Sequence, residues 1–175
     1  MKVRDIALIS NLTAASVVLR LVKHVFIGVL PIINFPIVFA LISGALFGPI
    51  YGFLVGFLSF IVSDVFLGMG IWTIITSFSC GFIGLIGGFI WYKRNPCRWE
   101  LLVLSMIMIF VYDVISSVLL YLTLMPLKEA FIVGLIGLFM PIMGGKLYMV
   151  GPVVEFSSAM LISILLPKLR GILNG

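Results

Sequence analysis

The chain has 175 residues, of which 63% are hydrophobic and 10% are charged, and its mean hydropathy is +1.35. A soluble domain carries about 25% charged residues, so this composition is too apolar to cover a surface that faces water. The sequence therefore predicts an integral membrane protein. Five or six spans of about 20 residues each would use most of the chain and leave no room for a soluble catalytic domain.

The charged residues and cysteines exclude several other classes. The chain has 11 Lys and Arg against 6 Asp and Glu, an excess that in a membrane protein reflects the preference of basic residues for cytoplasmic loops, so we expect no nucleic-acid partner. Cys80 and Cys97 are too few for a disulfide framework and are expected to be free thiols. The single histidine, His24, excludes a multi-histidine metal centre, and we expect no metal or cofactor.

Proline and glycine divide the chain into predicted helices. Pro31 and Pro36 interrupt the chain after the first helix, and Gly48-Pro49 separates the second from the third. The predicted helices span residues 6–23, 35–47, 50–66, 72–92, 101–124 and 152–166. Between the last two, residues 125–151 are rich in glycine and proline and predict an irregular connection.

Six spans place both termini on one side of the membrane. Seven basic residues share that side, namely Lys2, Arg4, Lys93, Arg94, Arg98, Lys168 and Arg170. Four lie on the other side, namely Arg20, Lys23, Lys128 and Lys146. The seven-to-four distribution predicts cytoplasmic termini. We therefore expect an all-α integral membrane protein, a six-transmembrane-helix bundle whose N and C termini are cytoplasmic and whose residues 1–175 form a single transmembrane domain.

Small side chains recur at helical spacing on three predicted helices and would allow close helix packing. The third carries Gly52, Gly56, Ser59 and Ser63, and the fourth carries Ser77, Gly81, Gly84 and Gly88. We interpret these two strips as contacts within the chain. On the first helix the strip is Ala7, Ser10, Asn11, Ala14 and Val18, and it would contact either another helix of this chain or another protein.

Three acidic residues fall in or near predicted spans. Asp113 lies near the bilayer centre, where a carboxylate costs about 2.5–3.5 kcal/mol, so it either contacts a ligand or forms an internal hydrogen bond to Ser116, Ser117 or a tyrosine. Glu155, in the first turn after Pro152, either caps its helix or contacts a ligand. Asp64 is expected in the headgroup region.

Polar and aromatic residues gather at the predicted outer ends of the helices. Arg20, Lys23 and His24 either extend to the membrane interface, the commoner role of such residues, or contribute to a binding cup. Trp72, in a glycine-rich loop, is either an interfacial anchor or part of a binding cup.

The order of these motifs along the chain resembles the substrate-binding S component of an energy-coupling factor (ECF) vitamin transporter. The stretch Leu-Phe-Gly-Pro-Ile-Tyr-Gly-Phe-Leu-Val-Gly at 46–56, followed by Ser63-Asp64, is similar to that family's second and third helices. The loop Gly-Ile-Trp-Thr at 70–73, with Gly81 and Gly84 downstream, is similar to a subgroup linked with corrinoids.

The resemblance implies binding of a vitamin or related micronutrient on the outer side, by loops after helices 1, 3 and 5 and by helices 4 to 6. On this chain the implied substrate-binding residues are Asn34, Trp72, Thr73, Thr76, Asp113, Lys146, Tyr148 and Glu155. A corrinoid is the first expected substrate.

The resemblance also implies partners, namely a transmembrane coupling subunit and two ATPases. The family pattern A-x-x-x-A on the first helix contacts the coupling subunit, and here it reads Ala7-x-x-x-Asn11 and Ser10-x-x-x-Ala14. Neither pair is a full match, which leaves the docking residues open.

Two other interpretations remain. The chain could be a membrane-embedded enzyme or accessory subunit of isoprenoid or lipid metabolism, with Asp113 and Glu155 as acid and base, or a structural partner that binds no ligand. The recognised motifs of soluble hydrolases and nucleotide-binding proteins are missing from the sequence, so ATP hydrolysis would have to come from another chain.

Overall fold

The computed structural model describes residues 2–27, 32–139 and 150–174. These residues form helices and contain no strand. The helices are α1 (Val3–Ile27), α2 (Phe35–Phe47), α3 (Pro49–Leu67), α4 (Ile71–Trp91), α5 (Arg98–Tyr121), α6 (Leu127–Phe139) and α7 (Val150–Asn174). Five of them, α1, α3, α4, α5 and α7, are long and apolar enough to cross a membrane. The prediction of an all-α membrane bundle is confirmed at this level.

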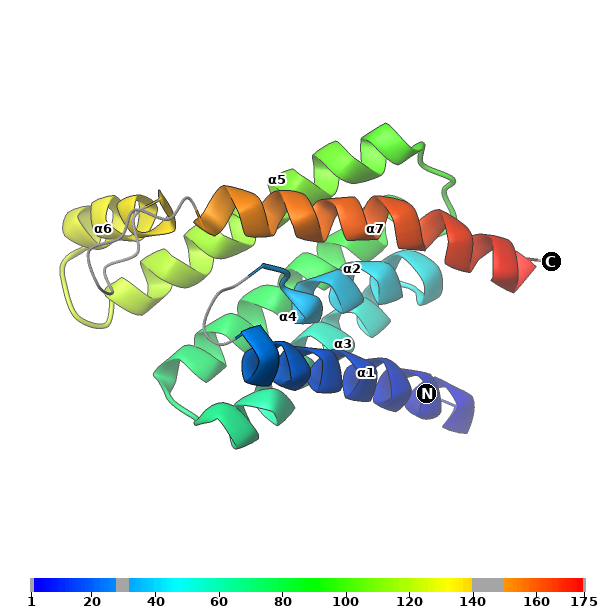
Figure 1. The fold of residues 1–175 in the computed structure, drawn as a ribbon, viewed down its shortest axis with the longest axis horizontal. Helices are drawn as coiled ribbons and strands as arrows, with labels where there is room; N and C mark the ends of the chain where they lie inside the picture. The colour runs from blue at the N-terminus through cyan, green and yellow to red at the C-terminus, as the bar shows by residue number, and fades with distance from the viewer. Residues whose placement is uncertain (1, 28–31, 140–149, 175) are drawn as a thin grey trace.

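The long helices run back and forth along the bundle, and both termini lie at the same end of it (Figure 1). The Gly68–Gly70 turn between α3 and α4, the start of α7 and the whole of α6 lie at the opposite end. We call this opposite end the far end.

One predicted connection is in fact helical. Residues 125–151 were expected to be irregular, but residues 127–139 form α6, which begins just after Pro126 and packs beside α5. Gly134 permits this contact, because a Cβ atom there would lie 3.1 Å from the Val118 side chain of α5. The glycine that suggested a break in the helix instead allows two helices to approach closely.

The last helix also differs from its predicted bounds. It begins at residue 150 rather than 152 and continues through Pro167 to residue 174. Beyond the proline, the Arg170 guanidinium donates hydrogen bonds to the backbone oxygens of Trp91, at 2.7 Å, and Ala45, at 3.0 Å. These bonds satisfy carbonyl groups near the ends of α2 and α4 and hold the final turns of α7 against the bundle.

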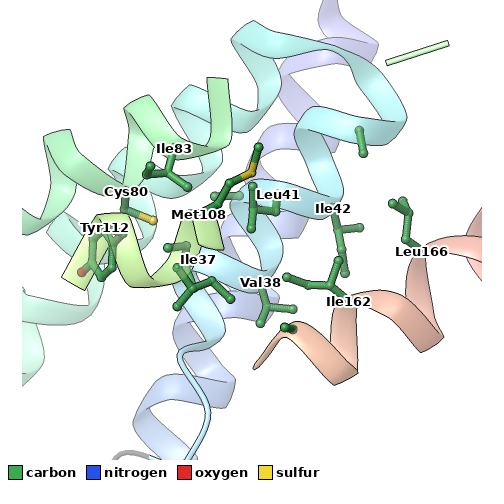
Figure 2. Close-up of a cluster of buried hydrophobic side chains, with 14 of the residues drawn as sticks. Ile37, Val38, Leu41, Ile42, Cys80, Ile83, Met108, Tyr112, Ile162 and Leu166 are labelled. Atoms are coloured by element: carbon green, nitrogen blue, oxygen red, sulfur yellow. The ribbon is translucent and has the colours of Figure 1, made fainter. Parts of the chain in front are cut away.

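Helix α2 forms the centre of the bundle. It is apolar around its whole circumference, as expected for a helix with protein on all sides, and it packs against α1, α3, α4 and α7. Figure 2 shows its side chains among those of α4, α5 and α7; the labelled residues are Ile37, Val38, Leu41, Ile42, Cys80, Ile83, Met108, Tyr112, Ile162 and Leu166. One continuous core therefore joins the two halves of the chain.

Glycine allows α2, α3 and α4 to pack at backbone distance. A Cβ atom on Gly44, Gly52 or Gly84 would come within 3.0 Å of backbone atoms of a neighbouring helix, and one on Gly56 would lie 2.9 Å from the Cys80 carbonyl oxygen. The predicted packing of the small-residue strips of α3 and α4 within the chain is confirmed. The predicted free thiols are confirmed as well, with Cys80 buried and Cys97 exposed.

Candidate binding site at the far end of the bundle

A pocket of about 240 Å³ opens at the far end between α1, α3 and α4. Its lining residues are Arg20, Lys23, His24, Asp64, Leu67, Gly68 and Trp72. Most of them are polar or charged in a chain that is otherwise strongly apolar. The pocket therefore concentrates the scarce polar groups where three helix ends meet.

A largely buried ion pair lines this pocket. The Arg20 guanidinium lies 2.7 Å from a carboxylate oxygen of Asp64, whose side chain is only 2% exposed. The Arg20 guanidinium also donates to the Ser63 hydroxyl. The expectation that Asp64 sits among headgroups is wrong, and so is the expectation that Arg20 extends to the interface, because each residue supplies the countercharge that makes burial of the other tolerable.

The second oxygen of Asp64 fixes the start of α4. It accepts a hydrogen bond of 2.7 Å from the Thr73 hydroxyl, and that hydroxyl accepts a bond of 3.2 Å from the Gly70 backbone N–H. Thr73 is fully buried. The loop before α4 is thus tied through one carboxylate to α1.

This loop places Trp72 at the pocket. A Cβ atom at Gly70 would collide with the Trp72 ring, so the indole folds back over the glycine. Trp72 remains 47% exposed and lines the pocket. The neighbouring Thr76 donates its hydroxyl proton to the Trp72 carbonyl oxygen, at 2.7 Å, so this bond lies within the helix.

Two aromatic rings lead from the pocket toward α5. The Arg20 guanidinium lies 4.4 Å from the centre of the Phe60 ring, and the centres of the Phe60 and Tyr112 rings are 6.1 Å apart. This aromatic link joins the pocket to a second polar cluster.

The second cluster lies where α5 and α7 meet the start of α2. The backbone N–H of Asn34 donates to the Ser158 hydroxyl of α7 at 3.0 Å, and the Asn34 side chain makes no capping bond to α2. Asp113 of α5 lies within range of the charge of Glu155 of α7. Asn34, Asp113 and Glu155 therefore lie on elements that meet in this part of the fold.

The structure does not show the structural roles that were considered for Asp113 and Glu155, namely a hydrogen bond from Ser116 to the Asp113 carboxylate and a helix cap at Glu155. The Ser116 hydroxyl donates to the Asp113 backbone oxygen, at 3.2 Å, rather than to the carboxylate. Glu155 is 3% exposed, and its Oε1 atom has no hydrogen-bond partner among the described residues. It lies in the second turn of α7 because the helix begins at Val150, and this position is too far along the helix for a capping role.

The predicted site residues thus fall into two groups. Trp72, Thr73 and Thr76 belong to the pocket side, and Asn34, Asp113 and Glu155 belong to the second cluster. Lys146 and Tyr148 lie outside the described residues. Phe60 and Tyr112, which join the groups, were missed because a buried aromatic residue looks like any other core residue in an apolar sequence.

The predicted docking strip on α1 faces away from the bundle. Ala7, Ser10, Asn11 and Ala14 are all exposed, whereas Ile9, Thr13, Ser16 and Val17 turn toward the protein. Among the described residues, no other helix of the chain covers this strip.

The fold is that of a multi-pass membrane protein with a polar pocket at one end. A family model described as "ECF-type riboflavin transporter, S component" matches residues 1–154, and the chain belongs to this family. No curated protein and no solved structure matches the chain. The chain is thus a cell-membrane protein that serves as the substrate-binding subunit of an ECF importer for a vitamin, and it is not an enzyme.

Proposed function

We propose that this chain captures riboflavin, or a vitamin with a similar fused ring system, at the far end of the bundle. The observation that carries the proposal is the polar pocket at the far end, lined by Trp72 and joined to a second polar cluster by aromatic rings. A flavin has a flat aromatic ring that stacks on aromatic side chains and a hydroxylated chain that donates hydrogen bonds to carboxylates. The family description, which names riboflavin, supports the same substrate.

The first expected substrate, a corrinoid, gains no support. The matched family is described by a different vitamin. The enzyme interpretation, with Asp113 and Glu155 as acid and base, is not favoured either, because the family consists of transport subunits.

In this proposal the two polar groups have different tasks. Trp72, Asn34, Asp113 and Glu155 contact the vitamin, together with Lys146 and Tyr148 from the connection before α7. Thr73 and Thr76, whose hydroxyls bond within the protein, position the start of α4 and with it Trp72.

We also propose that the chain forms a single domain of six spans with both termini in the cytoplasm. The common position of the termini at one end of the bundle supports this arrangement, and so does the continuous core. Helix α2 would be the sixth span, short but fully apolar and enclosed by protein. The far end then faces the outside, where the vitamin arrives.

The exposed α1 strip supports a partner contact in the membrane. Small side chains at Ala7, Ser10 and Ala14 would let a helix of the coupling subunit approach closely, and Asn11 offers it an amide for hydrogen bonding. We propose that this strip docks on the coupling subunit, which works with two ATPases.

Riboflavin titration of the purified protein tests the substrate. Quenching of flavin fluorescence is expected to saturate at one flavin per chain. Trp72→Ala is expected to weaken binding about tenfold, because loss of one stacking ring removes about 1–1.5 kcal/mol. Trp99→Ala, at an exposed residue at the other end of the bundle, is the matched control and should bind normally. Absence of quenching by the unaltered protein would refute riboflavin as the substrate.

A further inference from the structure

The far-end pocket carries more positive charge than its own acidic residue balances. Arg20, Lys23 and His24 line it together with a single carboxylate, that of Asp64. The Arg20 guanidinium, at 2.7 Å, already engages that carboxylate. The pocket therefore retains the charge of Lys23.

Lys23 has no acidic partner among the residues that the structure describes. The chain contains six acidic residues, all within the described ranges: Asp5, Asp64, Glu100, Asp113, Glu129 and Glu155. None of them forms an ion pair with Lys23 among the described residues, and the undescribed internal segments, 28–31 and 140–149, contain no acidic residue. The chain itself therefore has no further internal carboxylate to offer this ammonium group.

The surroundings of Lys23 leave its charge available to a ligand. Its side chain is half-buried, and the hydrogen bond found for its ammonium group is a long one, 3.4 Å, to the Ile33 backbone oxygen. A lysine that merely extends to the interface would place its ammonium in water. Here the ammonium group lines a pocket next to Trp72. An ammonium group has three N–H donors, so it can also bind an incoming acceptor.

We propose that this pocket is an oxyanion subsite that binds a phosphate or carboxylate group carried by the substrate, with Lys23 as the principal partner. The inference rests on the proposed function and narrows its substrate class to anionic forms of the vitamin. His24 and Arg20 also line the pocket and are further donors for such a group. Asp64 holds Arg20 in place and leaves Lys23 to face the ligand.

A pair of flavins that differ by one phosphate tests this subsite. Riboflavin and riboflavin 5′-phosphate are titrated onto the purified chain in neutral detergent at low salt. We expect the phosphate ester to bind about tenfold more tightly, as one charge-assisted contact provides. Lys23→Gln should bring the ratio of the two affinities close to one. Lys128→Gln removes an exposed lysine of α6 at the same end of the bundle and should leave the ratio unchanged.

The possible outcomes separate the two proposals. Equal affinities for the two flavins, or a ratio that Lys23→Gln does not alter, would overturn the oxyanion subsite and leave the flavin site standing. Failure of both flavins to bind would overturn the proposed substrate. In that case inorganic phosphate is titrated while the tryptophan fluorescence of the chain is followed, and absence of a phosphate-dependent change that Lys23→Gln removes would overturn the subsite too.

A lipid phosphate is the competing occupant of this pocket. The titrations are therefore repeated in nanodiscs with and without phosphatidylglycerol. A preference for the phosphate ester that persists in both supports the subsite. A preference that phosphatidylglycerol abolishes would assign the pocket to a lipid headgroup and overturn the inference.

Discussion

Gly84→Ala is expected to lower the stability of the folded protein by about 1–3 kcal/mol, the usual cost of overpacking a tight interior. The new methyl group would come within 3.0 Å of the Gly52 backbone and would also meet the Ala40 side chain at 3.0 Å. Backbone atoms cannot relieve the contact by a change of rotamer, as a side chain can, so α3 and α4 must separate. Thermal unfolding in detergent measures the effect, and a fall in the midpoint of about 2–12 °C is expected for a chain of this size.

Gly171→Ala is the matched control for this change. Gly171 lies in the last turns of α7, and a Cβ atom there would meet no atom within 4 Å. Alanine favours a helix over glycine by about 0.5–1 kcal/mol, so this variant should be at least as stable as the unaltered protein. If Gly84→Ala unfolded at the same temperature as Gly171→Ala, the close packing of α3 against α4 would be refuted.

Asp64→Ala is expected to destabilise the protein by about 3 kcal/mol, the lower part of the range for breaking a buried ion pair, because Arg20 keeps some contact with solvent. The change leaves the Arg20 guanidinium without its countercharge and the Thr73 hydroxyl without its acceptor. The start of α4 should loosen, and Trp72 with it. Reduced thermal stability together with weaker flavin binding is therefore expected from this single substitution.

A double-mutant cycle separates the ion pair from the other contacts of Asp64. Arg20→Gln with Asp64→Asn should cost less than the sum of the two single changes, since each single change leaves one charge buried and unpaired. The exposed pair Arg94 and Glu100, 3.4 Å apart, is the control, and Glu100→Gln should cost less than about 0.5 kcal/mol. Strict additivity of the Arg20 and Asp64 changes would contradict the proposed role of the pair.

The fold could be predicted largely from glycine, proline and composition. Pro36 and the Gly48-Pro49 pair mark real helix boundaries, since α2 begins at Phe35 and α3 at Pro49. The same rule failed at Gly134, because a glycine that breaks one helix and a glycine that admits a neighbouring helix look alike in a single sequence. The difference depends on whether another helix lies beside the glycine. Here α5 lies beside Gly134 and contacts it through Val118.

The site was harder to predict than the fold. The sequence placed Arg20 and Asp64 at the same expected depth, but their pairing depends on how α1 and α3 are rotated about their axes. That rotation is set by packing across the whole interface, where Ile9, Thr13 and Val17 turn inward. Asp113 and Glu155 were singled out as rare acidic groups in an apolar chain, whereas Asn34 was implied only by the family resemblance; the structure adds that α2, α5 and α7 meet near them.

Co-purification with the ECF module tests the central claim that this chain is the docking, substrate-binding subunit of an importer. The tagged chain is co-expressed with the coupling subunit and ATPases and isolated from detergent. Recovery of all subunits with the tagged chain is expected, and Ala14→Trp on the exposed α1 strip should reduce it at least tenfold, since a bulky ring prevents close helix approach. Ile107→Trp, at another exposed position on α5, should not. Failure of the unaltered chain to retain the module would contradict the account.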